Sequence, residues 1–294
     1  MPPPLLIACA SLLFAVMGLC VKLASAEYSA GEIVFYRSLV GLVLIGALLR
    51  ARGVGVRTPV PAIHFWRCLC GVGALCLWFF AIGGLPLATA MTMNYMSSVW
   101  MALFLLGGAV LMGSARVDGR LVAAVLAGFC GVALILRPTA DPQQLWHGLA
   151  GLGSGMLSAL AYLQVTALGR AGEPETRVVF YFSLGGVLAG GAIVLATGGF
   201  GGHSAKGLGL LLAIGTCAAA AQLMMTRAYA IGSALANATL QYLGIVFAVL
   251  FGVFIFGDPL SLPTLGGIAL IVGAGITATL IGARAKVPAS RVES

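Results

Sequence analysis

The apolar stretch at residues 87–106 carries hydrogen-bonding side chains at its centre, namely Asn94, Tyr95 and Ser98. A polar group that is buried without a partner costs about 1–3 kcal/mol, so these side chains need either partners or a cavity. Asn94 and Ser98 are four residues apart and share one helix face, with Tyr95 beside them. Amide and hydroxyl groups on one face can bind a small molecule. Packing between helices is the alternative that the sequence leaves open.

A second copy of this pattern occurs later in the chain. The sequences AMTMNYMSSVW and NATLQYLGIVF align so that Asn94 corresponds to Gln241 and Tyr95 to Tyr242. In the second copy, Asn237 shares the helix face of Gln241. FYRSLVG and FYFSLGG recur in the same order, which predicts an internal duplication. The two predicted repeats are residues 1–140 and 141–294.

The composition predicts a membrane protein. Of the 294 residues, 61% are hydrophobic and 8% are charged, and the mean hydropathy is +1.08. A soluble protein carries about a quarter charged residues. A helix crosses a bilayer with about 20 apolar residues, and the chain offers ten such segments with short connectors. They are residues 4–24, 31–50, 64–83, 87–111, 120–137, 147–169, 177–197, 207–229, 234–257 and 262–283.

An odd number of spans in each repeat forces the two repeats into opposite orientations. The predicted fold is therefore an all-α membrane protein, with ten transmembrane helices arranged as two inverted five-helix repeats around a central cavity. Residues 4–24 are expected to be the first span rather than a removable signal peptide, because no basic region precedes them.

The basic residues predict the orientation. If both termini are cytoplasmic, 12 of the 16 Lys and Arg lie on the cytoplasmic side, as the positive-inside rule requires. The net charge of +8 then reflects topology in the inner membrane. No nucleic-acid partner is expected, since no loop is both basic and aromatic. The cytoplasmic set is Arg50, Arg52, Arg57, Arg67, Arg116, Arg120, Arg170, Arg177, Arg227, Arg284, Lys286 and Arg291, and Lys22, Arg137 and Lys206 lie outside.

Other apolar segments also carry polar or aromatic side chains. Ser158 and Tyr162 belong to a stripe of residues spaced by four, and Trp78 and Gln222 come from two further segments. We expect these four side chains to line the same cavity. A serine can instead bond the backbone of its own helix, and Trp78 can instead lie in an interfacial belt.

Two cations lie in or beside the apolar segments. Arg37 is the single charge that the sequence places deep within a segment. It could meet a substrate carboxylate, pair with Glu27 or Glu32, or extend outward. Lys22 ends the first segment and could line the cavity or point away from it. The sequence leaves these alternatives open.

Acidic residues and histidines are confined to loops and segment ends. A proton relay within the membrane usually needs Asp, Glu or His there. We therefore expect uniport or exchange rather than carboxylate-coupled proton antiport. An enzyme is not expected either, because no nucleophile has a histidine base within reach inside a segment.

The seven cysteines lie in apolar segments without the spacing of a metal site, so no metal, cofactor or disulfide framework is expected. All 12 prolines lie near termini, in loops or at segment ends. This distribution predicts helices without interruption in the membrane.

These features together resemble the drug/metabolite transporter superfamily, and within it the EamA-type ten-span exporters. The resemblance covers the whole chain and is carried by Lys22, by EIVFYRS, by the two copies around Tyr95 and Tyr242, and by the closing GFCGVALIL and GGIALIVGAGI. The nearest fit is the YddG-type aromatic amino-acid exporter. The proline that the family often has three residues after this tyrosine is replaced here by Ser98 and Ile245.

The resemblance implies a cavity lined by spans 1, 3, 4, 6, 8 and 9, with spans 5 and 10 outside. It also implies export of amino acids, including aromatic ones. Rocking of the two repeats would provide alternating access. We thus predict a monomeric exporter of small neutral or zwitterionic metabolites in the bilayer. Drugs, phosphorylated sugars and nucleotide sugars are the alternative substrates, and phosphorylated ones would call for several cavity cations.

Overall fold

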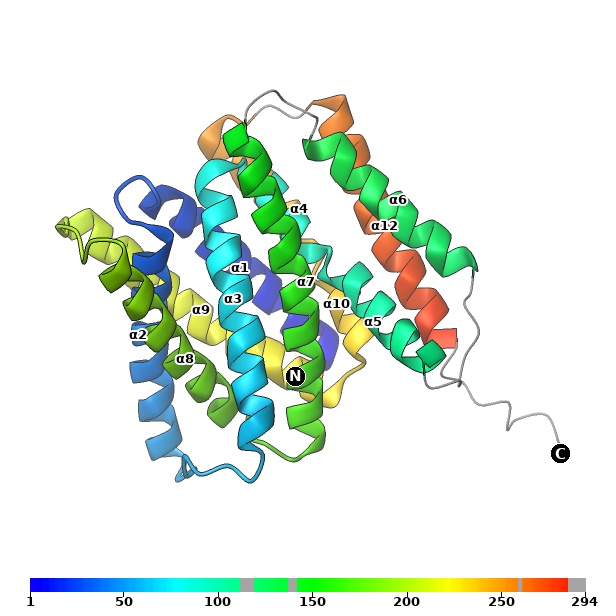
Figure 1. Ribbon diagram of the computed structural model, residues 1–294. Helices are drawn as coiled ribbons and strands as arrows, with labels where there is room; N and C mark the ends of the chain where they lie inside the picture. The colour runs from blue at the N-terminus through cyan, green and yellow to red at the C-terminus, as the bar shows by residue number, and fades with distance from the viewer. Residues whose placement is uncertain (112–118, 137–141, 259–260, 285–294) are drawn as a thin grey trace, which may run out of the picture.

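The computed structural model describes residues 1–111, 119–136, 142–258 and 261–284. Within these ranges the chain is helical and has no strand (Figure 1). The helices are α1 (Pro3–Ala24), α2 (Ala30–Ala51), α3 (Pro61–Gly84), α4 (Leu87–Tyr95), α5 (Ser97–Leu111), α6 (Gly119–Leu136), α7 (Pro142–Arg170), α8 (Glu175–Ala196), α9 (Ala205–Ile231), α10 (Ala234–Leu240), α11 (Leu243–Phe251) and α12 (Leu262–Arg284), with a π-helical turn, η1 (Gly252–Phe256), after α11.

Six of the described helices are long and apolar enough to cross a bilayer, namely α1, α2, α3, α7, α8 and α9. Their ends follow from local sequence. At the start of α2, Ser29 and Glu32 form a capping box, in which each side chain accepts a hydrogen bond from the other residue's backbone N–H. The first residue of α3 is Pro61, which suits a position where no backbone donor is needed. The prediction of an all-helical protein with apolar spans is confirmed.

The fourth and ninth predicted segments are each divided into shorter helices, α4 and α5 in one and α10 and α11 in the other. At these turns a backbone N–H donates to the carbonyl oxygen three residues earlier, as in a 3₁₀ turn. The bonds run from Val99 N to Met96 O at 2.9 Å and from Gly244 N to Gln241 O at 2.8 Å. The expectation of uninterrupted helices was therefore wrong, because a tightened turn breaks the α-helical pattern without a proline.

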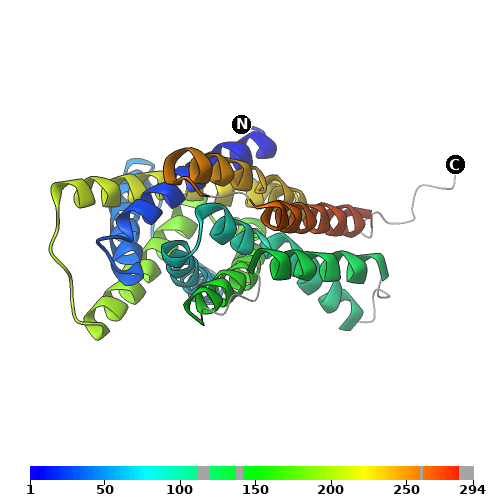
Figure 2. The same cartoon turned by 90° about the horizontal axis from the view of Figure 1, so that it is seen from above.

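The helices pack mainly in four pairs, which are α3 with α7, α1 with α9, α2 with α8, and α6 with α12. Figures 1 and 2 show that α6 and α12 lie side by side at one edge of the bundle, away from α2, α8 and α9. This agrees with the outer position that we expected for the fifth and tenth segments.

A glycine brings α7 close to α4 at the centre of the bundle. A Cβ atom at Gly155 would lie 2.7 Å from the carbonyl oxygen of Met93, which is closer than real Cβ contacts allow. Only glycine therefore permits this approach. The close contact places the polar stripe of α7 directly against Asn94 of α4.

Large apolar side chains remain exposed on the surface of the bundle. Leu195 is 74% exposed and Phe254 is 81% exposed. A soluble protein rarely shows extensive apolar patches. These side chains suit contact with lipid tails.

Candidate functional site

A cavity of about 50 Å³ lies where α1, α2, α3, α4, α7, α8 and α9 meet. Its wall combines apolar side chains such as Phe14, Leu75 and Met225 with a few polar groups. Pockets that hold small molecules usually measure about 300–1,000 Å³, so the cavity has to widen before it admits a metabolite. Seven of the residues predicted from the sequence line it, namely Arg37, Trp78, Asn94, Tyr95, Ser158, Tyr162 and Gln222.

Asn94 connects α4 to α7 at the wall of the cavity. Its Nδ2 atom donates to Ser154 Oγ at 3.0 Å and to Ser158 Oγ at 3.2 Å. Ser154 in turn donates to the backbone oxygen of Gly151 at 2.6 Å. The alternatives of packing and cavity lining thus both apply: the amide holds two helices together, and Asn94 and Ser158 also face the cavity.

Tyr95 lines the cavity, whereas its repeat partner Tyr242 does not. The Tyr242 hydroxyl is hydrogen-bonded to Ser98 Oγ, and Tyr242 also lines a separate apolar groove between α11 and α12. Ser98 and Tyr242 therefore join the fourth and ninth segments to each other. The hydroxyl of Tyr95 is buried beside Gly244 of α11 and has no hydrogen-bond partner in the structure.

Gln241 and Asn237 both lie outside the cavity lining. Asn237 donates from Nδ2 to the backbone oxygen of Ala228 at 2.6 Å and so satisfies a carbonyl near the end of α9. Gln241 donates to the hydroxyl of Tyr229 at 3.2 Å. Tyr229 stacks on the cavity residue Tyr162, with ring centroids 5.1 Å apart. Gln241 also forms a side-chain hydrogen bond with Tyr162, so it lies directly behind the cavity wall.

Lys22 also lies outside the cavity. Its Nζ atom donates to three backbone oxygens at the end of α3 and beyond it, those of Ile82 at 3.0 Å, Gly83 at 3.3 Å and Leu85 at 2.7 Å. A cation at a helix C-terminus meets the negative end of the helix dipole. The position that the sequence suggested for Lys22 in the substrate site is thus replaced by a structural one.

Arg37 faces the cavity, 4% exposed. It does not pair with either of the acids that the sequence offered. Glu27 accepts from Ser204 Oγ at 2.8 Å, and Glu32 serves the capping box and accepts from Gly201 N at 2.9 Å. This leaves the cavity-facing alternative for Arg37.

Arg67 is a cavity residue that sequence reasoning missed. We had placed it at the cytoplasmic end of the third segment, yet it is 2% exposed and lines the cavity. Its guanidinium carbon lies 4.2 Å from the ring centroid of Phe182, and that of Arg37 lies 5.1 Å from the same centroid. A signal was present in the sequence, because Arg67 precedes Trp78 by about three helical turns and so shares its face.

The described residues of the cavity include two arginines and no carboxylate or histidine. Arg116, Arg137, Lys286 and Arg291, which the topology prediction also used, lie outside the described residues. The cavity is therefore electropositive and partly apolar. An aromatic wall with two guanidinium groups suits a molecule that has both apolar surface and anionic oxygen atoms.

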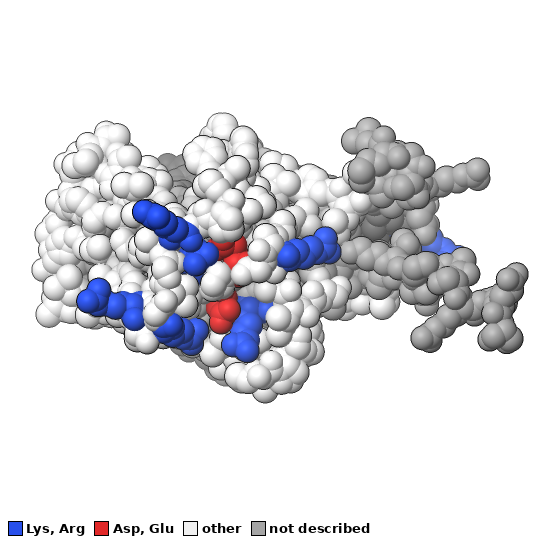
Figure 3. Space-filling view, turned by 90° about the horizontal axis from the view of Figure 1, so that it is seen from below, with Lys and Arg blue, Asp and Glu red and all other residues white. Residues whose placement is uncertain are grey.

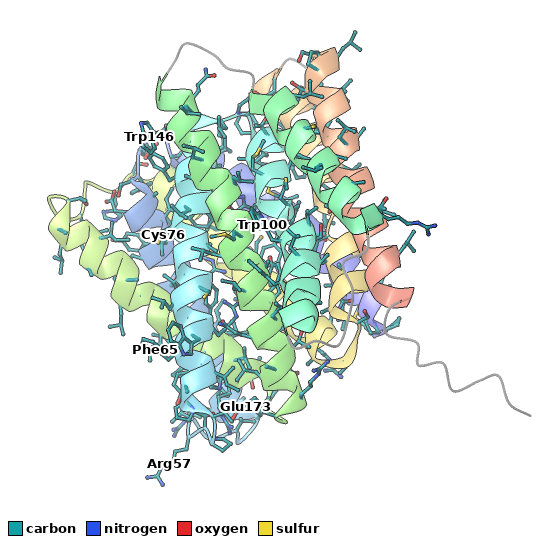
Figure 4. All side chains as sticks on the ribbon, turned by 45° about the vertical axis from the view of Figure 1, so that its right-hand side comes forward. Arg57, Phe65, Cys76, Trp100, Trp146 and Glu173 are labelled. Carbon is teal, nitrogen blue, oxygen red and sulfur yellow. The ribbon has the colours of Figure 1, made fainter. Side chains whose placement is uncertain are left out.

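A group of side chains from the α2–α3 loop, α3, the α7–α8 loop and α8 forms what we call the Glu173 cluster, made of Thr58, His64, Glu173 and Arg177. Glu173 accepts from Thr58 Oγ1 at 2.7 Å and from Arg177 Nη1 at 3.0 Å, and His64 Nε2 lies 3.5 Å from its carboxylate. Glu173 is labelled in Figure 4, at the end of the molecule where the α2–α3 and α7–α8 loops meet.

The same end of the molecule is rich in basic side chains. Figure 3 shows Lys and Arg gathered there around acidic groups. Arg52 and Arg227 each lie within 3.7 Å of Glu175, and Arg177 pairs with Glu173. This distribution agrees with the cytoplasmic side that the positive-inside rule predicts.

Residues 1–137 match the model of the EamA-like transporter family. The pseudopaline exporter CntI of Pseudomonas aeruginosa is 34% identical to this chain over 271 residues, which cover 91% of this chain and 93% of that protein. The chain belongs to the EamA-like transporter family. The predicted resemblance to EamA-type transporters is thereby confirmed.

Other relatives carry different substrate names. A riboflavin transporter of Rhizobium johnstonii is 30% identical over 75% of this chain and 71% of that protein. An S-adenosylmethionine uptake transporter of Rickettsia bellii is 23% identical over 83% of this chain and 81% of that protein. A solved crystal structure shares the fold, with a TM-score of 0.67 and 21% identity over 97% of this chain and 99% of that one. None of the named transporters is named as an aromatic amino-acid exporter, so that assignment stays a prediction.

Proposed function

We propose that this EamA-family transporter exports small zwitterionic metabolites, amino acids first, through the cavity between α3, α4 and α7. The observation that carries the proposal is the lining itself, where Arg37 can meet a carboxylate and Asn94 and Tyr95 can accept or donate hydrogen bonds beside Trp78. Recognition of a metabolite by an apolar wall with a few placed polar groups is the usual design of such sites.

The relatives support transport of metabolites rather than an enzymatic role. One is named as an exporter, and others are named as transporters of riboflavin or S-adenosylmethionine. An inner-membrane location with both termini in the cytoplasm, and a monomeric state, belong to the same proposal. The basic end around the Glu173 cluster supports this orientation.

The proposal includes ten spans in two inverted repeats, residues 1–140 and 141–294. It is supported by helix contacts that exchange between the repeats. The pair α3 with α7 corresponds to α9 with α1, the pair α5 with α7 to α11 with α1, and the pair α2 with α9 to α8 with α3. Contacts that match under exchange of two halves are what a rocking mechanism needs, since either half can open in the same way.

Alternating access follows from the closed Glu173 cluster and the small cavity. In the conformation described here, residues of both proposed repeats meet in that cluster, Thr58 from one and Glu173 from the other. Breaking these contacts would open the cavity toward the cytoplasm. Because the described cavity residues include no carboxylate or histidine, we propose uniport or exchange.

The test is uptake of radiolabelled phenylalanine and alanine by proteoliposomes, with and without an imposed pH gradient. Saturable uptake that ignores the gradient supports a facilitator of amino acids. Uptake that the gradient strongly stimulates contradicts uniport, and no uptake of either amino acid contradicts amino-acid export.

A second candidate function is transport of phosphorylated metabolites, and the position of Arg67 in the cavity favours it. The sequence offered one deep cation, which is too few for a phosphate site, whereas the structure brings Arg37 and Arg67 to one ring.

A further inference from the structure

Arg67 and Arg37 approach Phe182 from two antiparallel helices. Arg37 lies on α2 and Arg67 on α3, which run in opposite directions (Figure 1). Both guanidinium groups lie over the ring that α8 supplies. Gly71, one turn after Arg67, has no side chain and leaves room for the Nη1 atom of that arginine. The two charges are thus built into the wall of one cavity.

The two arginines have no counter-charge in the part of the chain that the structure describes. No acidic side chain there lies within 4.0 Å of either guanidinium, and Glu173 is already held by Thr58 and Arg177. The Nε atom of Arg37 and the Nε and Nη1 atoms of Arg67 are buried without a hydrogen-bond partner. These three donors point to a missing acceptor.

Two buried cations without an acceptor are costly to the folded protein. Contact with an aromatic ring stabilises a desolvated cation. It offsets only part of the cost of burying a charge without a partner. A ligand that brings anionic oxygen atoms would offset this cost when it binds, and a neutral ligand would not.

We propose that the cavity selects metabolites that carry at least two negative charges, on two carboxylates or on one phosphate, with Arg37 and Arg67 both binding the anionic oxygen atoms. This inference rests on one part of the proposed function, namely that the cavity is the transport site. Asn94, Ser158 and Tyr162 would then bond the uncharged polar part of the substrate, and Trp78 would contact its apolar part.

The test compares ligands that differ in charge and little else. Purified protein in lipid nanodiscs is titrated with glutamate and glutamine, which are nearly isosteric, and separately with glucose 6-phosphate and glucose. Dissociation constants come from the shift in thermal unfolding. The variants are Arg67→Gln, Arg67→Lys and, as a control, Arg50→Gln, since Arg50 is an exposed arginine of α2.

In the wild type we expect the charged member of at least one pair to bind about tenfold or more tightly than its neutral partner, since hydrogen bonds to charged groups are stronger than those to neutral groups. Arg67→Gln brings that ratio close to one, Arg67→Lys keeps part of it, and Arg50→Gln leaves it unchanged. Glutamate preference identifies carboxylates, and preference for glucose 6-phosphate identifies phosphate. Without ligand, Arg67→Gln unfolds at the same temperature as the wild type or a higher one, because a buried unpaired charge is removed.

Two results overturn the inference: equal binding of both members of both pairs by the wild type, or an unchanged ratio in Arg67→Gln. If phenylalanine is nevertheless transported in proteoliposomes, the proposed function survives without the anion selectivity. If no amino acid is transported but anion binding that depends on Arg67 is found, the selectivity for anions is supported and amino-acid export is contradicted.

Discussion

Thr58 donates a hydrogen bond of 2.7 Å to Glu173 and so joins the loop before α3 to the loop before α8. Arg177 adds a second bond to the same carboxylate, and its Nε atom donates to Gly55 O at 2.9 Å. Tyr181 donates to Val56 O at 2.7 Å. The loop at residues 53–60 is thereby tied to α8 by several bonds, of which those to Glu173 are charge-assisted.

Replacing Glu173 with alanine should loosen this end of the transporter. Loss of a buried, hydrogen-bonded carboxylate costs about 1.5–3 kcal/mol for each bond to it, and His64 and Arg177 are left without their acid. We expect faster hydrogen exchange in residues 53–67 and little change in α6 and α12. Glu175→Ala is the matched control, because its partners Arg52 and Arg227 are exposed and such surface pairs contribute about 0–1 kcal/mol. Equal exchange in both variants would show that Glu173 does not hold the loops.

The same cluster should depend on pH. Burial raises the pKa of Glu173, but hydrogen bonds from Thr58 and Arg177 lower it by more, so the pKa lies below its ordinary value of about 4.3. A depressed pKa means that the carboxylate stabilises the closed cluster above the ordinary value, and that this stability is lost as pH falls through the folded-state pKa. Hydrogen exchange of residues 53–67 should therefore stay slow from neutral pH to about 5 and rise below about 4.

Glu173→Gln is the control for the pH prediction. It cannot titrate at that position, so its exchange should show no extra step in the acidic range once intrinsic rates are corrected. The same acidic step in both proteins would assign it to another group.

Asn94→Ala should lower transport with little loss of folded protein. The amide donates to two serines of α7 and also faces the cavity, so both its contact with substrate and its alignment of α4 are lost. We expect a drop in kcat/KM of about tenfold, which corresponds to about 1.4 kcal/mol. The matched control is Thr92→Val, because the hydroxyl of Thr92 bonds only Ala88 O of its own helix, at 2.6 Å. Similar losses in both variants would mean that α4 packing, not the site, is affected.

Lys22→Met should lower stability and leave substrate affinity unchanged. The three carbonyl groups at the end of α3 lose their shared cation, which costs about 1–3 kcal/mol. We expect a lower midpoint of thermal unfolding and an unaltered KM for any transported amino acid. A raised KM with normal stability would instead return Lys22 to the substrate site.

The sequence alone was enough for much of the cavity. Asn94, Ser158, Tyr162 and Gln222 were found because polar side chains spaced by helical periodicity inside apolar segments need partners or space, and that pattern is local. The cavity lining includes all four. The repeat that pairs Asn94 with Gln241 identified related positions but not their environment, and Gln241 bonds Tyr229 behind the lining.

The sequence by itself determined the class of molecule, namely a transporter family with apolar helices and basic connectors. It could do so because hydropathy and charge are properties of each segment separately. The tertiary structure alone decided which cations face the cavity. Arg67 lines the cavity although the sequence did not place it there, and Lys22 does not line it although the sequence offered it. The reason is that a long side chain extends toward whichever opening or unsatisfied carbonyl the neighbouring helices leave. The turns that divide the fourth and ninth segments likewise depend on backbone hydrogen bonding. The sequence has no proline at these turns that would have predicted them.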